Sequence, residues 1–184
     1  LSSIVLWSLS FVAIRMGLEG YTAGALALFR LLVASSCLFV TLPFIRFKGQ
    51  IKRSQLPFLV SLGVVGIACY SILLNSGEKT VPAAIASFIA IDLSLGLLFV
   101  ALAATCGSLH SILQKYLLKE LSPVLLTALG TFIATLTLLP FLPELLASFA
   151  SAPIKATYSA FFLGIVPSTL GQWLWTYGLS RTLV

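Results

Sequence analysis

The chain has 184 residues, of which 59% are hydrophobic and only 9% are charged, and its mean hydropathy is +1.10. Soluble globular domains are about half apolar and a quarter charged, so this composition excludes an ordinary water-soluble domain. The net charge is +6, but the Lys and Arg residues cluster in loops between apolar segments. We therefore expect the lipid bilayer as partner and no nucleic acid.

Six long apolar segments follow one another along the chain. A helical crossing of a bilayer core needs about 20 apolar residues, and backbone groups in lipid must hydrogen bond within their own segment. The segments are residues 1–14, 21–45, 54–77, 93–114, 121–143 and 156–180, and the second is interrupted only by Arg30. The sequence therefore predicts an all-α integral membrane protein with about six transmembrane helices.

A seventh apolar segment, residues 80–91, is shorter and covers only about half of a crossing. A full crossing here would reverse the side on which every later loop lies. We expect this segment to form a short helix at the outer side or to continue into the next span, with Asp92 near the outer boundary.

The basic residues of the loops predict the orientation. With the N-terminus inside, seven Lys and Arg residues fall on the inner side and three on the outer side. The inner residues are Arg46, Lys48, Lys52, Arg53, Lys115, Lys119 and Arg181, and the outer residues are Arg15, Lys79 and Lys155. The positive-inside rule then predicts a cytoplasmic N-terminus.

The chain also resembles itself at an offset of about 100 residues. Identical pairs include Ser8/Ser108, Leu26/Leu126, Ala34/Ala134, Leu38/Leu138 and Pro43/Pro143, and residues 62–65 match 163–166 one position further on. The repeat unit contains three spans, an odd number, so the two copies are predicted to have inverted topology. Inverted repeats are typical of secondary transporters, and we place the copies at residues 1–91 and 92–184.

The residues of the first two spans carry a family resemblance. Residues 6–15 (LWSLSFVAIR) and 29–34 (FRLLVA) resemble the start of the EamA type of the drug/metabolite transporter superfamily. The first helix of that family typically reads W-G-x-x-F, and its second carries R-F-x-x-A. The resemblance covers nearly the whole chain, although Ser8 replaces the glycine of the first motif.

The resemblance implies ten helices in two inverted five-helix halves, with both termini in the cytoplasm of a bacterium and the helices in its inner membrane. It also implies a secondary-type permease or exporter of small metabolites or drugs. The chain begins with Leu1, and helices are expected to be missing around Ile91 and after Val184. The alternative is therefore a truncated remnant that does not transport, or a module that needs a partner chain. A homodimer is left open.

Arg30 and His110 are ionisable candidates inside spans. A charge within a transmembrane helix costs about 2.5–3.5 kcal/mol on insertion scales, so Arg30 needs a partner or a function. It is either an anion-binding or gating charge that faces a cavity, or an arginine that snorkels or pairs for packing. His110, the only histidine, is either a proton relay or a hydrated packing residue near the inner end, and we favour the second reading.

The last span has two distinct faces. Ser168, Gln172 and Trp175 share one face at positions i, i+4 and i+7, and Gly164, Gly171 and Gly178 share another, so one face is expected to bind and the other to pack. Alternatively, Trp173, Trp175 and Tyr177 form an aromatic belt at the membrane surface. The complete set of pathway candidates is Trp7, Ser10, Arg30, Asn75, His110, Gln114, Gln172 and Trp175.

The sequence offers little for catalysis. Cys37, Cys69 and Cys106 fall in apolar segments without the spacing of zinc ligands, and the five acidic residues form no paired motif. A phosphate-binding Gly-rich loop is also missing. We therefore expect no metal, no cofactor and no enzymatic activity, and a small-molecule substrate instead.

Overall fold

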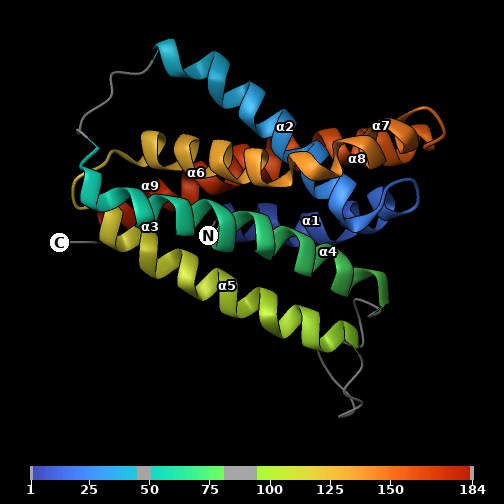
Figure 1. Ribbon diagram of the computed structural model, residues 1–184, viewed down its shortest axis with the longest axis horizontal. Coiled ribbons are helices and arrows are strands. Elements are labelled where there is room, and N and C mark those ends of the chain that lie inside the picture. Colours follow the sequence, from blue (N-terminus) through green and yellow to red (C-terminus); the bar gives the residue numbers. More distant parts are fainter. Residues whose placement is uncertain (1, 45–50, 81–94, 183–184) are drawn as a thin grey trace.

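The computed structural model describes residues 2–44, 51–80 and 95–182, which form six helical rods without any strand (Figure 1). The first three rods are α1 (Ser2–Leu18), α2 (Ala23–Thr41), and α3 (Leu56–Ser61) continued by a π-helical segment (Leu62–Cys69) and α4 (Tyr70–Thr80). The last three are α5 (Leu95–Leu117), α6 (Pro123–Leu138) with α7 (Leu142–Phe149), and α8 (Ile154–Ile165) continued by a π-helical segment (Val166–Gly171) and α9 (Gln172–Arg181). Short 3-10 turns lie at Leu42–Phe44, Arg53–Gln55 and Leu139–Phe141.

Four of the rods in the described part of the chain are long and apolar enough to cross a membrane, namely Ala23–Thr41, Arg53–Lys79, Leu95–Leu117 and Pro123–Phe149. These coincide with the second to fifth predicted spans. The first and last predicted spans are also helical, but α1 is shorter and the α8–α9 rod is more polar. The prediction of an all-α membrane protein is confirmed. Except for Thr80, which ends α4, the predicted short segment at 80–91 and Asp92 lie outside the described residues.

The turns that follow α1 and α5 have the same hydrogen bonds. Gly20 N and Tyr21 N donate to Gly17 O, and Glu120 N and Leu121 N donate to Leu117 O, at distances between 3.0 and 3.2 Å. Thr22 and Ser122 then occupy the N-cap positions of α2 and α6 with extended backbones, because a short hydroxyl residue favours the start of a helix. These residues are paired at an offset of 100, so the local structure repeats as the sequence does.

The two copies run in opposite directions, and helices of one copy pack against helices of the other. In Figure 1, α1 runs towards the right of the picture and α5 towards the left. The α1 helix packs against α8 of the other copy, and α5 packs in the same way against α4 and the first π-helical segment. Likewise, α2 packs against α8, α6 packs against the first π-helical segment, and α2 and α6 pack against each other. The third rod of each copy therefore lies between helices of the other copy.

Two equivalent glycines, Gly63 and Gly164, allow helices of the two copies to pack closely. A methyl group on Gly63 would lie 2.6 Å from Ile133 Cβ and 3.0 Å from Gly130 O, and one on Gly164 would lie 2.5 Å from Val33 Cβ and 2.8 Å from Arg30 O. The contacted residues are themselves equivalent, at an offset of 100. Because hydrophobic burial does not drive helices together inside lipid, small residues that permit close backbone approach are the expected solution.

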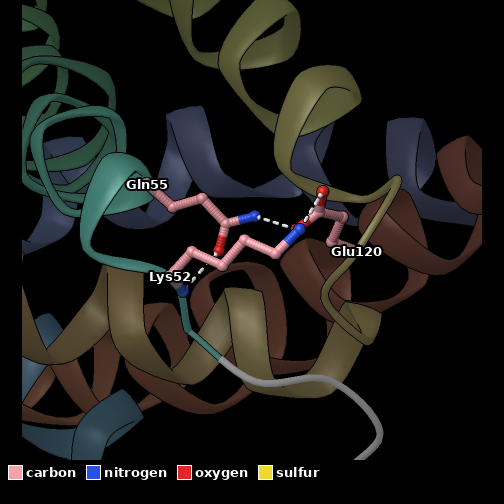
Figure 2. A network of polar contacts seen from close by, with 3 residues as sticks. All are labelled: Lys52, Gln55 and Glu120. Atoms are coloured by element: carbon pink, nitrogen blue, oxygen red, sulfur yellow. Dashed lines mark hydrogen bonds and ion pairs between the residues drawn. The ribbon is translucent and has the colours of Figure 1, made fainter.

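A polar network links the two copies at one end of the bundle. Lys52 Nζ lies 2.9 Å from Glu120 Oε1, and Gln55 Nε2 donates to Glu120 Oε2 at 2.8 Å (Figure 2). Lys52 N also donates to Gln55 Oε1 at 3.1 Å, which orders the start of the third rod. Glu120 belongs to the turn between α5 and α6, so this network joins one copy to the other.

The equivalent contact at the opposite end is apolar. A methyl group on Gly20 would lie 2.9 Å from Ala152 Cβ and 3.0 Å from Ala156 Cβ. Gly20 corresponds to Glu120, and Ala156 corresponds to Gln55 at an offset of 101. Related contacts of different chemistry therefore join the two copies at the two ends of the bundle. Ion pairs of Arg15 with Glu78 and of Lys155 with Glu19 lie near the apolar end.

Candidate functional site

A cavity of about 390 Å³ lies between the two copies, and every one of the six rods contributes residues to its lining. Its size is within the range of pockets that bind small organic molecules. Six of the eight predicted pathway residues line it: Trp7, Ser10, Arg30, His110, Gln172 and Trp175. Many lining residues are paired by the repeat, such as Ser10 with His110 and Ser71 with Gln172. The cavity therefore lies close to the axis that relates the copies.

Arg30 enters the cavity from α2 and is only 7% exposed. Its Nη2 donates to Ser71 Oγ at 2.5 Å, and Ser71 Oγ donates in turn to Ile67 O at 2.6 Å. The Nε atom is buried and has no hydrogen-bond acceptor. Arg30 thus lies inside the bundle and does not snorkel to the membrane surface. Its guanidinium group is oriented by a hydroxyl, and no carboxylate of the described residues neutralises it.

The side chains of His110 and Gln172 contact each other in the wall of the cavity. The His110 Nε2 and Gln172 Nε2 atoms are 2.7 Å apart, so an acceptor role for the ring nitrogen puts the ring proton on Nδ1. His110 Nδ1 is buried. A methyl group on Gly66 would lie 2.5 Å from this atom, so Gly66 leaves room for the ring. His110 therefore lies at the cavity.

Trp7 and Trp175 form the aromatic part of the lining. Their ring centroids are 5.3 Å apart with an angle of 44° between the planes, and Trp7 Nε1 donates to Pro167 O at 3.4 Å. Gly171 accommodates Trp7, because a methyl group there would lie 3.0 Å from Trp7 Nε1. The repeat relates Trp7 to Gly107 and Gly171 to Tyr70. At this equivalent contact the glycine is on the first helix of the copy and the aromatic residue on the third rod, since Gly107 lies against the ring of Tyr70.

The predicted faces of the last span are only partly correct. Ser168, Gln172 and Trp175 all line the cavity, as the spacing predicted, whereas Trp173 and Tyr177 are 37% and 42% exposed on another side. The aromatic residues are therefore divided between the cavity and the outer surface. Gly178 does not pack as predicted, because nothing lies within 4 Å of a methyl group placed there.

Asn75 and Gln114 are fully buried but do not line the cavity. Asn75 Nδ2 donates to Ala23 O at 2.9 Å, and Gln114 Nε2 donates to Thr176 Oγ1 at 3.0 Å. Both side chains tie one rod to another. Sequence reasoning missed Tyr70, Ser71 and Thr131 of the lining. The repeat could have identified Ser71, because it is the equivalent of the candidate Gln172.

The arrangement favours binding over catalysis. Arg30 is the charged residue of the lining, and within the described residues no Asp or Glu contributes to it. The same residues contain no group of three His, Cys, Asp or Glu side chains that could hold a metal ion. What the cavity offers a ligand is a fixed positive charge, several hydroxyl groups and an aromatic surface.

The sequence matches the family described as the EamA-like transporter family over residues 1–91 and 94–184. It is 29% identical over 225 residues to a protein of Streptantibioticus cattleyicolor named "Probable terminal-alkyne amino-acid exporter", which covers 99% of this chain and 75% of that protein. It is 30% identical over 220 residues to an uncharacterized transporter of Bacillus subtilis, YdfC, which covers 95% and 71% respectively.

An uncharacterized transporter of Archaeoglobus fulgidus is 23% identical over 220 residues, covering 97% of this chain and 78% of that protein. Each of these matches is longer than the 184 residues of the chain, so the relatives contain residues without a counterpart here. No solved structure matches the chain significantly.

Proposed function

The chain belongs to the EamA-like transporter family, and on that basis we propose that it moves small organic molecules across a membrane by alternating access between two inverted halves, residues 1–91 and 92–184. The observation that carries this proposal is the cavity between the copies, because all six rods line it. A ligand held there contacts both halves at once. A rocking motion of one half against the other would then expose it to either side.

The two ends of the bundle support such a motion. Related contacts join the two copies at both ends, through Glu120 at one and Gly20 at the other. Breaking one set while keeping the other opens the cavity to a single side. The exposed Lys52–Glu120 pair contributes little to stability, so this end can open at small cost. The tight contact at Gly20 depends on shape and re-forms without desolvating a charge.

Export is the direction we propose, since one relative is named an exporter of a terminal-alkyne amino acid. Such a compound combines a small polar head with an apolar tail, and the cavity combines Arg30 with two tryptophans. We also propose a cytoplasmic N-terminus in a bacterial inner membrane. The distribution of basic residues supports this orientation.

A second candidate is a chain that transports only with a partner, or a remnant that does not transport. The relatives' additional residues favour this alternative. The purified chain alone in proteoliposomes distinguishes the two, with a labelled panel of amino acids, sugar phosphates, nucleosides and drugs. Flux above empty liposomes supports the transporter, and flux that needs a second chain, such as a longer relative, supports the partner module.

Cysteine accessibility tests the alternating mechanism directly. In a chain without Cys37, Cys69 and Cys106, Ser108→Cys places a thiol in the cavity and Thr105→Cys places one on the same helix outside it. We expect Ser108→Cys to react with an impermeant maleimide added from either side of the membrane, and Thr105→Cys to react much less, because lipid excludes the reagent. Reaction of Ser108→Cys from one side only would contradict alternating access.

A further inference from the structure

The cavity has an uncompensated positive charge. Arg30 is only 7% exposed, and within the described residues no carboxylate lines the cavity beside it. Keeping a guanidinium group in a membrane is costly unless a partner offsets that cost. Ser71 supplies one neutral acceptor, but Arg30 Nε remains buried without any. The five N–H donors of the planar Arg30 guanidinium group are therefore only partly used.

His110 belongs to the other copy and lines the same cavity. Its Nε2 atom is 2.7 Å from Gln172 Nε2, and its buried Nδ1 atom lies against Gly66. His110 therefore adds a polar ring to the lining, and the charge that a ligand meets there comes from Arg30. A ligand with several acceptor atoms and negative charge would satisfy the guanidinium group.

The aromatic lining constrains the remainder of the ligand. The rings of Trp7 and Trp175 form a tilted pair with centroids 5.3 Å apart, and Phe11 also lines the cavity. Such surfaces favour a flat or apolar body. They offer no fixed negative charge that would select an amine.

We propose that the substrates of the cavity are small organic anions, whose carboxylate binds Arg30 while an apolar body packs against Trp7 and Trp175. This assignment rests on the proposed transport function and specifies its substrate class. Arginine binds a carboxylate with two parallel hydrogen bonds, which lysine cannot match. The Ser71 hydroxyl orients the guanidinium group before the ligand arrives.

Two probes of the same size and opposite charge test the assignment. The purified chain in phosphatidylcholine nanodiscs is titrated with phenylacetate or phenethylamine, while tryptophan emission and the unfolding temperature are recorded. A bound ligand raises the unfolding temperature by mass action. We expect phenylacetate to change both signals and phenethylamine to change neither. Equal or stronger binding of phenethylamine would overturn the proposal, and this comparison requires no variant.

Variants locate the anion. Arg30→Gln should weaken phenylacetate binding about tenfold or more, since a charge-assisted hydrogen bond is lost. Arg181→Gln removes an exposed charge outside the cavity and should bind as the parent does. Unchanged affinity in a folded Arg30→Gln protein would overturn the proposal.

An anionic lipid head group is the other source of the same chemistry. The titration is repeated in phosphatidylglycerol nanodiscs at high salt, which screens the surface charge. Unchanged phenylacetate affinity supports a soluble substrate, and loss of binding assigns Arg30 to a lipid and overturns the proposal. In proteoliposomes, flux of phenethylamine without phenylacetate would reject the substrate class but leave transport intact. Saturable phenylacetate binding without flux of any solute would support the anion site and count against the transport function.

Discussion

Ser35 Oγ and Thr135 Oγ1 lie 2.8 Å apart, and the two residues are separated by 100 positions, which is the offset of the internal repeat. Equivalent residues of two inverted copies can meet only at the axis that relates them. The contact between α2 and α6 therefore marks that axis. Thr135 Oγ1 also lies 3.2 Å from Leu31 O and 2.9 Å from Thr131 O of its own helix, so its single proton is shared between acceptors on both helices of the crossing.

We predict that this contact contributes only modestly to stability. In membranes, a hydrogen bond between helices is worth about 0.6 kcal/mol on average, because the separated helices find other partners. A double-mutant cycle with Ser35→Ala and Thr135→Val, measured by unfolding in mixed micelles, should return a coupling of about that size. A coupling near zero would show that the two hydroxyl groups do not interact.

Equivalent glycines should respond equally to substitution. Gly63→Ala and Gly164→Ala each force a methyl group against a β-branched side chain and a backbone carbonyl, and overpacking typically costs about 1–3 kcal/mol. Gly178→Ala is the control, because nothing lies within 4 Å of the added methyl group. We expect the first two variants to unfold at lower temperature and the control to match or exceed the parent. A destabilised control would show that helix backbone effects dominate.

The orientation of the chain can be tested at the two ends of the bundle. Ile51→Cys lies beside the Lys52 network, and Ala150→Cys lies near the Gly20 contact, and both positions are exposed. In intact cells and a background without native cysteines, an impermeant maleimide should label Ala150→Cys and not Ile51→Cys. The reverse pattern would place the N-terminus outside the cell.

Closing one end covalently should stop transport. A methyl group on Gly20 would lie 3.0 Å from Ala156 Cβ, close to the spacing of about 3.5–4.5 Å in a disulfide. The pair Gly20→Cys and Ala156→Cys should therefore cross-link on oxidation, abolish flux in proteoliposomes, and recover flux after reduction. Each single variant serves as a control. Full flux in the cross-linked protein would mean that this contact stays closed during the cycle.

Arg30 should oppose membrane insertion of its own helix. Arg30→Leu removes the charge of α2, which costs about 2.5–3.5 kcal/mol at the centre of a span, so the isolated segment should insert more efficiently in a glycosylation assay. In the folded chain, Arg30→Ala should instead abolish or alter transport without loss of the protein from the membrane. Uptake equal to that of the parent would exclude Arg30 from the substrate site.

The sequence alone determined the class of protein, the order of the rods and the relation between the copies. The length of an apolar segment and the restriction of charge to loops can be read from each segment by itself. They therefore predicted the spans that contain α2, α4, α5 and α6 from the sequence alone. Self-similarity along the chain predicted the pairs that the structure brings into equivalent contacts, such as Gly63 and Gly164.

Only the tertiary structure decided which polar side chains face the cavity. Gln172 and Gln114 look alike in sequence, yet Gln172 reaches His110 at the cavity and Gln114 bonds Thr176 inside the helix packing. Asn75 likewise bonds the backbone of Ala23. In lipid, a polar group must be satisfied either by a neighbouring helix or by a cavity. Which of these it meets depends on the rotation and separation of the rods, and the spacing of residues along one helix does not encode those quantities.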